Sequence, residues 1–247
     1  MLRFSEANAK TEGIGEWSSI ENPKIYSMSI ISGYTCPGAK ECQAWVIEDK
    51  ETGKRKVLRG KDANITCFSV SQEAQYTSVY NQRKHNFDLL SKHRYNSNAM
   101  FGLIYNSIPK DANYIRVHVG GDFFTSEYML AWYSVARFRS DITFYAYTKS
   151  IQFQIDNEPY RPDNFHINSS EGGKQDSLIH EFGLKSFDVV LHPSKTTRPI
   201  DHNEYYALHN EGSASFLVHG TQEAGSEASK AQSEMKKQNI PFSYNRK

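Results

Sequence analysis

The chain has 247 residues, with 29 Lys and Arg against 28 Asp and Glu, a formal net charge of +1, and 38% hydrophobic residues. A chain of this length buries about 70% or more of the surface that its unfolded form exposes, so one domain needs no disulfides. The small net charge argues against a protein that binds nucleic acid through phosphates alone. Apolar runs such as 187–191 are far shorter than the roughly 18 residues of a membrane span. The first residues also lack the apolar core of a secretory signal, so we expect a cytoplasmic protein without a membrane segment.

The first third of the chain predicts a strand, a hairpin and two helices. Residues 25–32 alternate apolar and small polar side chains, which is typical of a strand. A hairpin is predicted from two short strand-like segments, 45–48 and 56–59. A helical pattern runs from 71 to about 92, with Ser69 or Ser71 as its N-cap, and a second runs from about 98 to 107 and stops before Pro109.

The middle of the chain predicts a β-α-β unit. Strand 114–119 is followed by a Gly-Gly-Asp turn, a helix over 126–138 and a strand over 142–147. A crossover of this length implies parallel strands. Further strands are expected at 164–168, 187–191 and 214–218, with a final helix over 226–237. Six strands therefore predict a single α/β domain over 1–247, an open parallel sheet or an incomplete β/α barrel, with its core at about 25–238 and extensions over 1–24 and 239–247.

Cys36, Cys42 and Cys67 are the chain's three cysteines. An odd number in a reducing compartment disfavours disulfides. Three unrelated buried cysteines are the simplest interpretation, since free Cys is among the most buried residue types. However, Cys36 and Cys42 bracket a loop that opens with Pro37-Gly38, and Cys67 precedes a helix N-terminus, where the helix dipole favours a thiolate.

Two kinds of metal site could use these thiols. A structural zinc ion needs a fourth ligand and usually has close Cys-x-x-Cys pairs, which the chain lacks. A four-iron cluster normally takes four cysteines, so three would leave one iron for a side chain, water or substrate. The spacing favours iron-sulfur over zinc.

In parallel α/β folds the functional site lies at the carboxyl ends of the strands. Polar residues and glycines follow most of the predicted strands, and the candidates are Cys36 and Cys42, Gly120, Gly121 and Asp122, Lys149, Ser170, and Gln222. Taken singly, each has a simpler explanation: a tight turn for the glycines, a solvated charge for Lys149, and a buried core position for His118. Their shared place at strand ends predicts one common site.

The order of strand, cysteine loop, and strand ending in Gly120-Gly121-Asp122-Phe123 resembles the incomplete six-stranded barrel of radical S-adenosylmethionine enzymes. In that superfamily three cysteines hold a four-iron cluster, and the methionyl amino and carboxylate groups of the cofactor bind the fourth iron. A Gly-Gly-Glu-Pro segment offers backbone carbonyls to the amino group, and Gly120 and Gly121 stand in its place. The cysteines depart from the superfamily's Cys-x3-Cys-x2-Cys pattern, because 5 and 24 residues separate them here, and the proline is absent.

The chain is also similar to a family of bacteriophage proteins. The shared segments are a Cys-Pro-Gly-Ala loop at 36–39, a segment like 117–124 and a segment like 143–150, and the resemblance runs from about 25 to about 232. It implies family membership and cluster binding more than a defined activity. A phage origin implies the cytoplasm of an infected bacterium.

The leading hypothesis is a 4Fe-4S protein with Cys36, Cys42 and Cys67 as ligands. If the fourth iron binds S-adenosylmethionine, the chain is a radical enzyme that needs an electron donor such as a reductase or a ferredoxin-like protein, with Lys149, Ser170 and Gln222 as further contacts. Otherwise His118, His192 or Asp122 could supply a fourth ligand, and the cluster would carry electrons or staple the fold. A zinc protein is less favoured. A nucleic-acid-associated factor is also less favoured, because the short basic runs that would suggest one, such as 54–56 and 83–85, are usually solvated surface.

Overall fold

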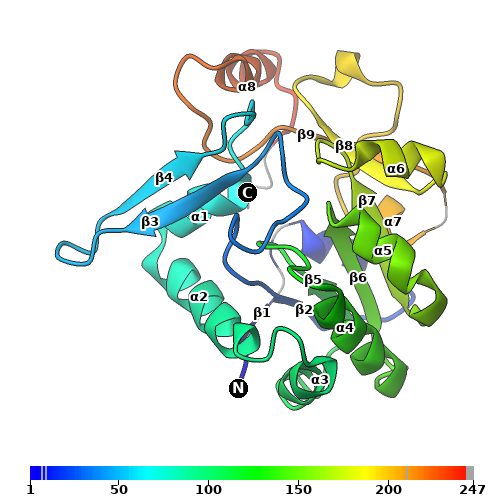
Figure 1. Cartoon of the computed structure of the whole chain (residues 1–247). Coiled ribbons are helices and arrows are strands. Elements are labelled where there is room, and N and C mark those ends of the chain that lie inside the picture. Colours follow the sequence, from blue (N-terminus) through cyan, green and yellow to red (C-terminus); the bar gives the residue numbers. More distant parts are fainter. Residues whose placement is uncertain (7, 9, 210, 243–247) are drawn as a thin grey trace.

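The computed structural model describes residues 1–242 except 7, 9 and 210. Its main sheet contains β1 (Phe4–Glu6), β2 (Ile25–Met28), β5 (Tyr114–Val117), β6 (Thr143–Thr148), β7 (Phe165–Ser170), β8 (Ser186–Val190) and β9 (Ala214–Leu217). These strands lie side by side in the order β1-β2-β5-β6-β7-β8-β9 (Figure 1). From β2 to β9 all neighbours are parallel, and β1 pairs antiparallel with β2. The α/β class and the six parallel strands are confirmed, and the sheet is open, with β1 and β9 at its edges.

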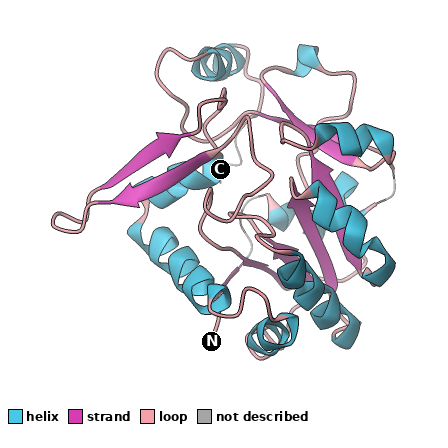
Figure 2. Cartoon of the chain, viewed as in Figure 1, coloured by secondary structure: helices cyan, strands magenta, loops and turns pink. Residues whose placement is uncertain are grey.

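Helices fill the connections between the strands (Figure 2). They are α1 (Phe68–Gln75), α2 (Thr77–Ser91), α3 (Ser97–Tyr105), α4 (Ser126–Phe138), α5 (Ile151–Asn157), α6 (Asp176–Glu181), α7 (Tyr205–Leu208) and α8 (Glu227–Lys237), with short 3-10 helices at Thr11–Glu16, Glu158–Tyr160 and Pro193–Lys195. The expected hairpin is β3 (Ala44–Glu48) paired with β4 (Arg55–Arg59), and it projects away from the main sheet in Figure 1.

The single helix expected from 71 to about 92 is instead two helices, α1 and α2. Tyr76 interrupts them with an extended backbone at φ −111° and ψ 109°. Arg55 of β4 fixes this break, because its guanidinium donates to the Ala74 carbonyl at 3.4 Å and to the Thr77 hydroxyl at 2.8 Å. The first helix begins at Phe68, so Cys67 occupies the N-cap position that was expected for Ser69 or Ser71.

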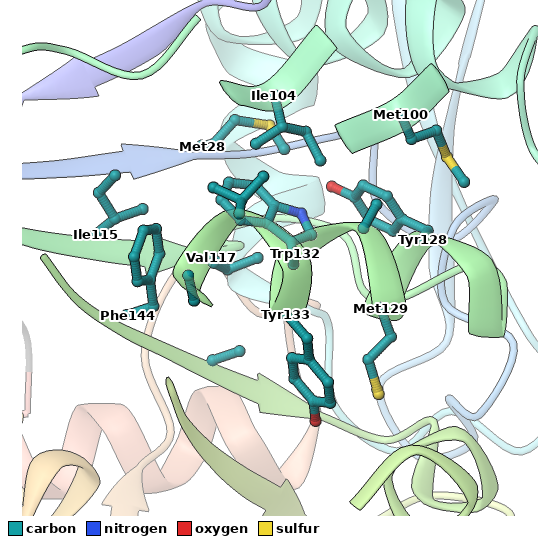
Figure 3. Packing of buried hydrophobic residues seen from close by; sticks show 14 of the residues in the cluster. Met28, Met100, Ile104, Ile115, Val117, Tyr128, Met129, Trp132, Tyr133 and Phe144 are labelled. Atoms are coloured by element: carbon teal, nitrogen blue, oxygen red, sulfur yellow. The ribbon is translucent and has the colours of Figure 1, made fainter. Parts of the chain in front are cut away.

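The larger core lies between the sheet and α3 and α4. In α4, Tyr128, Met129, Trp132, Tyr133 and Ala136 recur at three- and four-residue spacing and are all buried, which makes one face of this helix apolar. Figure 3 shows Trp132 and Tyr128 packed in the same cluster as residues of β2 and β5. Thr125 begins the helix by accepting the Tyr128 N–H at 3.2 Å.

A second apolar cluster covers the other face of the sheet. It joins Tyr145 of β6 and Phe187 of β8 to Leu208 of α7 and to Ile14 of the first 3-10 helix. Residues 1–24 therefore contribute an edge strand and buried side chains to the packing. Of the extension expected over 239–247, residues 243–247 lie outside the described part. No helix in the described part of the chain is long and apolar enough to cross a membrane.

Candidate functional site

A cavity of about 820 Å³ opens at the carboxyl ends of the six parallel strands. This volume lies within the range of roughly 300–1,000 Å³ that is typical of small-molecule sites. Its wall includes residues that follow each strand in turn, namely Ser32, Gly120, Lys149, Glu171, Leu191 and Val218. Parallel strands place all their carboxyl ends at one edge, which is why residues so far apart in sequence share one cavity.

Cys36, Cys42 and Cys67 all line this cavity. The three thiols are partly buried, and they lie close enough that Cys42 and Cys67 both act electrostatically on Cys36, and Cys42 acts on Cys67. Cys36 and Cys42 come from the loop after β2, whereas Cys67 precedes α1, with 24 residues between Cys42 and Cys67. The fold thus brings together the two cysteine segments that the sequence keeps apart.

Backbone hydrogen bonds hold the cysteine loop in place. Its Gly38 carbonyl accepts the Lys174 N–H at 2.8 Å, and the Glu41 N–H donates to the Gly172 carbonyl at 3.0 Å, which fixes the loop to the end of β7. The Glu41 carbonyl also accepts the Asn64 N–H at 3.0 Å, which ties the loop to the segment leading to Cys67. Glycine is required at position 38, because a Cβ there would collide with the Lys149 carbonyl.

Burial raises the pKa of all three thiols, that of Cys67 to about 12 and that of Cys36 well above its usual value. Backbone N–H groups act in the opposite direction: Gly33 donates to Cys36 Sγ at 3.4 Å, and the N–H groups of Ser69 and Val70 lower the pKa of Cys67. The thiols are therefore protonated at neutral pH in the metal-free chain. A metal cluster bound here would displace those protons, since the thiolate is the ligand.

In the part of the chain that the structure describes, no three His, Cys, Asp or Glu side chains are grouped so that they could hold a metal ion. The donors of a single ion must converge on one point. In a four-iron cubane, by contrast, each cysteine binds a different iron, so its ligands are spread around the cluster.

A buried ion pair positions the helix that carries Cys67. Arg83 of α2 donates to the Ser69 carbonyl at 3.0 Å and to the Glu73 carboxylate at 3.0 Å, and both charged side chains are buried. Glu73 also accepts the N–H and hydroxyl of Ser32, the residue that enters the cysteine loop. One network thus links α1, α2 and the segment after β2.

The Gly120-Gly121-Asp122 turn packs directly against the cysteine loop. Gly121 has φ +87°, and a Cβ there would collide with Ile30 and lie 2.8 Å from Thr35 Oγ1. The Gly120 carbonyl accepts the Ile30 N–H at 3.0 Å, so the fold already uses this carbonyl. Asp122 is 5% exposed and lines the cavity.

The remaining residues predicted to contact a ligand, Lys149, Ser170 and Gln222, lie at two different places. The Lys149 ammonium donates to Ser170 Oγ at 3.0 Å and to the Glu171 carbonyl, and all three residues line the cavity. Gln222 instead holds the backbone before Cys67: its side chain accepts the Thr66 N–H at 2.8 Å and donates to the Thr66 carbonyl at 3.0 Å. Its contact with the cysteine segment is therefore through Thr66.

The candidate histidines are separated. His118 is buried beside the cavity with φ +70°, and its Nε2 lies 3.0 Å from the Tyr128 hydroxyl, while Nδ1 has no hydrogen-bond partner in the described structure. Burial lowers its pKa to about 3, so the ring is neutral. His192 lies at the surface, where it contacts Ser194 and Gln238.

Sequence reasoning missed a second buried ionic cluster in the cavity wall. The Glu204 carboxylate accepts hydrogen bonds from Arg116 and from the Tyr147 hydroxyl, and Lys10 Nζ lies 3.3 Å from it. Lys10, Arg116 and Tyr147 line the cavity. The sequence shows that these residues are charged but does not indicate that they meet, because Arg116 and Lys10 are at least 88 positions from Glu204.

Fold and site together define an α/β protein with three cysteines at the carboxyl edge of an open, mostly parallel sheet. The chain belongs to the family described as gene product 88, whose profile matches residues 2–238. This agrees with the phage-type family that the sequence resembles. No curated protein and no solved structure matches the chain.

Proposed function

We propose that this protein binds a 4Fe-4S cluster through Cys36, Cys42 and Cys67, with the iron that lacks a cysteine facing the cavity and binding S-adenosylmethionine. The observation that carries the proposal is the meeting of these thiols, from two distant segments, in one cavity at the carboxyl ends of six parallel strands. The strands neighbour one another in chain order from β2 to β9, which is the order of an incomplete β/α barrel. With a phage-type family, the site of action would be the cytoplasm of an infected bacterium.

Several features of the chain suit a bound cluster. The cysteine loop is anchored on two sides, and backbone N–H groups face the sulfurs of Cys36 and Cys67, as is usual for ligated thiolates. The cavity also continues well beyond the thiols, toward Tyr147 and Phe216. A cluster that only stapled the fold would not need this additional space.

If bound here and reduced by an external one-electron donor, such a cluster would supply the electron for cleaving S-adenosylmethionine to methionine and an adenosyl radical, which would take a hydrogen atom from a substrate. The chain's own contribution is to hold the thiolates, to exclude water, and to present the Gly-Gly turn and polar strand ends to the ligands. Because Ile30 occupies the Gly120 carbonyl, we assign contact with the cofactor's amino group to the Gly121 side of the turn.

Electron paramagnetic resonance on the reconstituted, reduced protein tests this function. Adding S-adenosylmethionine should change the cluster's spectrum and yield 5′-deoxyadenosine. S-adenosylhomocysteine is the matched control, because it keeps the amino and carboxylate groups but has no sulfonium to cleave. It should change the spectrum without giving product. If the cluster is intact but neither compound changes its spectrum, the open iron site is refuted. That result would favour an electron carrier or a structural cluster.

A further inference from the structure

The cavity wall contains two buried cations, Lys10 and Arg116, which we call the cation pair. Lys10 is 7% exposed and Arg116 is 8% exposed. Both line the cavity, together with the aromatic rings of Tyr147 and Phe216. Lysine and arginine are almost never buried to this extent unless they are paired. The partners of the cation pair therefore decide what the site can bind.

The carboxylate of Glu204 holds the cation pair from behind. Its Oε1 accepts a hydrogen bond from Arg116 and lies 3.3 Å from Lys10 Nζ, and its Oε2 accepts the Tyr147 hydroxyl. Glu204 is 0% exposed and, among the described residues, is not part of the cavity wall. The donors therefore lie on the cavity side of the carboxylate, and the positive end of this arrangement faces the cavity.

Aromatic rings and a backbone carbonyl fix the two cations in place. Lys10 Nζ lies 3.6 Å from the centroid of the Phe216 ring. Arg116 Cζ lies 5.2 Å from the centroid of the Tyr147 ring, and Arg116 Nε donates to the His118 carbonyl at 3.4 Å. Cations are attracted to aromatic faces, so both side chains are ordered before a ligand arrives. A ligand that binds them loses little affinity to ordering of the site.

The backbone is strained at this place. Four described residues other than glycine have a left-handed backbone, and two of them, Asn22 and Asn239, are asparagines, which adopt it readily. The other two are His118, with φ +70°, and Glu204, with φ +62°, and both contact Arg116. Such strain persists where the surrounding structure enforces it, and it is concentrated at functional sites.

The charge balance leaves room for an anion, because the carboxylate behind the cation pair serves two cations. Asp201 also acts on Lys10, but burial raises the pKa of Asp201, which lowers its ionised fraction. Glu171 and Asp188 of the same cavity wall pair with Arg198 instead, at 2.7 and 3.7 Å. Burial also lowers the pKa of Lys10, so a bound anion would stabilise its charged form.

We infer that Lys10 and Arg116 bind an oxyanion, a carboxylate or a phosphate, of a small molecule that occupies the cavity. Because burial has already removed water from both cations, they interact more strongly with an anion than exposed side chains would. The planar guanidinium also suits the geometry of both kinds of oxyanion. The ligand class is thus a small organic anion. Only its role as the substrate of a cluster-dependent reaction rests on the proposed function.

Isothermal titration calorimetry on the full chain, purified without oxygen, tests this site with succinate and inorganic phosphate as probes. At least one probe should bind, and the one that binds identifies the oxyanion. Succinamide, the neutral analogue of succinate, should not bind. Lys10→Met should weaken binding by about tenfold or more, because it removes a charged donor and keeps the apolar stem. Lys56→Met is the matched control, because Lys56 is exposed on β4, and it should bind as the wild type does.

Three results would overturn the inference: no binding of either probe by the wild-type chain, equal binding by Lys10→Met, or equal binding of succinamide. If Lys10→Met does not fold, Lys10→Gln takes its place, because its amide can still donate to Glu204. Iron and sulfide are measured on the same samples. A chain that lacks both but binds the anion would overturn the proposed function and leave this inference standing.

Discussion

Arg83→Met should destabilise the whole domain and loosen the Cys67 segment. The variant keeps the apolar stem of the side chain but removes the cation, which leaves the Glu73 carboxylate 0% exposed and without its ion-pair partner. Removing one member of a buried ion pair costs about 3–5 kcal/mol. Domains of this kind have total stabilities of about 5–15 kcal/mol, so the loss takes a large share of the total.

Urea unfolding, followed by circular dichroism, measures this loss. Lys84→Met is the matched control, because Lys84 lies next to Arg83 on α2 but forms an exposed pair with Asp88. We expect it to cost less than about 0.5 kcal/mol. The double variant Glu73→Gln with Arg83→Met should recover part of the loss, because no isolated charge remains buried. A loss below about 1 kcal/mol for Arg83→Met would refute the claim that this pair organises α1.

Three further predictions concern the turn, the pH dependence and the segment before Cys67. Gly121→Ala should destabilise the protein far more than Gly53→Ala in thermal unfolding: both positions have positive φ, but a Cβ meets other atoms only at Gly121. The pKa of His118 is about 3 in the folded protein, below its usual 6.5. At a pH between these two values the unfolded chain binds more protons than the folded chain, so the free energy of unfolding falls as the pH falls. Between pH 7 and pH 5 this group should cost the metal-free protein about 2 kcal/mol, and His118→Phe should reduce the slope of stability against pH measured by urea unfolding. If the protein holds the proposed cluster, Gln222→Ala should speed the loss of its iron to a chelator, because the variant frees the Thr66 backbone, while Gln238→Ala should not; equal rates would contradict that role.

The parts of the fold that follow a local pattern could be predicted from sequence. The unit β5-α4-β6 was predicted correctly because the apolar spacing changes from two to 3.6 residues and back, and each of the other four parallel strands was predicted from its own apolar segment. The break at Tyr76 was missed because the helical pattern continues through it, and the bend depends on Arg55 of a distant hairpin.

Contacts that topology creates could not be derived from spacing. The Arg83–Glu73 pair and the Glu204 cluster join residues whose proximity depends on how the sheet and helices pack. At Glu204 the backbone is also left-handed, with φ +62°, which no side-chain pattern indicates. The strand-end rule, by contrast, needs only the strand order, so it placed Lys149 and Ser170 at the same edge, where they now contact each other.

Metal and acid-labile sulfide analysis of protein purified without oxygen tests whether Cys36, Cys42 and Cys67 hold the proposed 4Fe-4S cluster. We expect about four iron and four sulfide per chain, with broad brown absorption, and a loss of both in Cys36→Ser, Cys42→Ser and Cys67→Ser. Zinc without sulfide, or iron and sulfide that persist in all three serine variants, would contradict it.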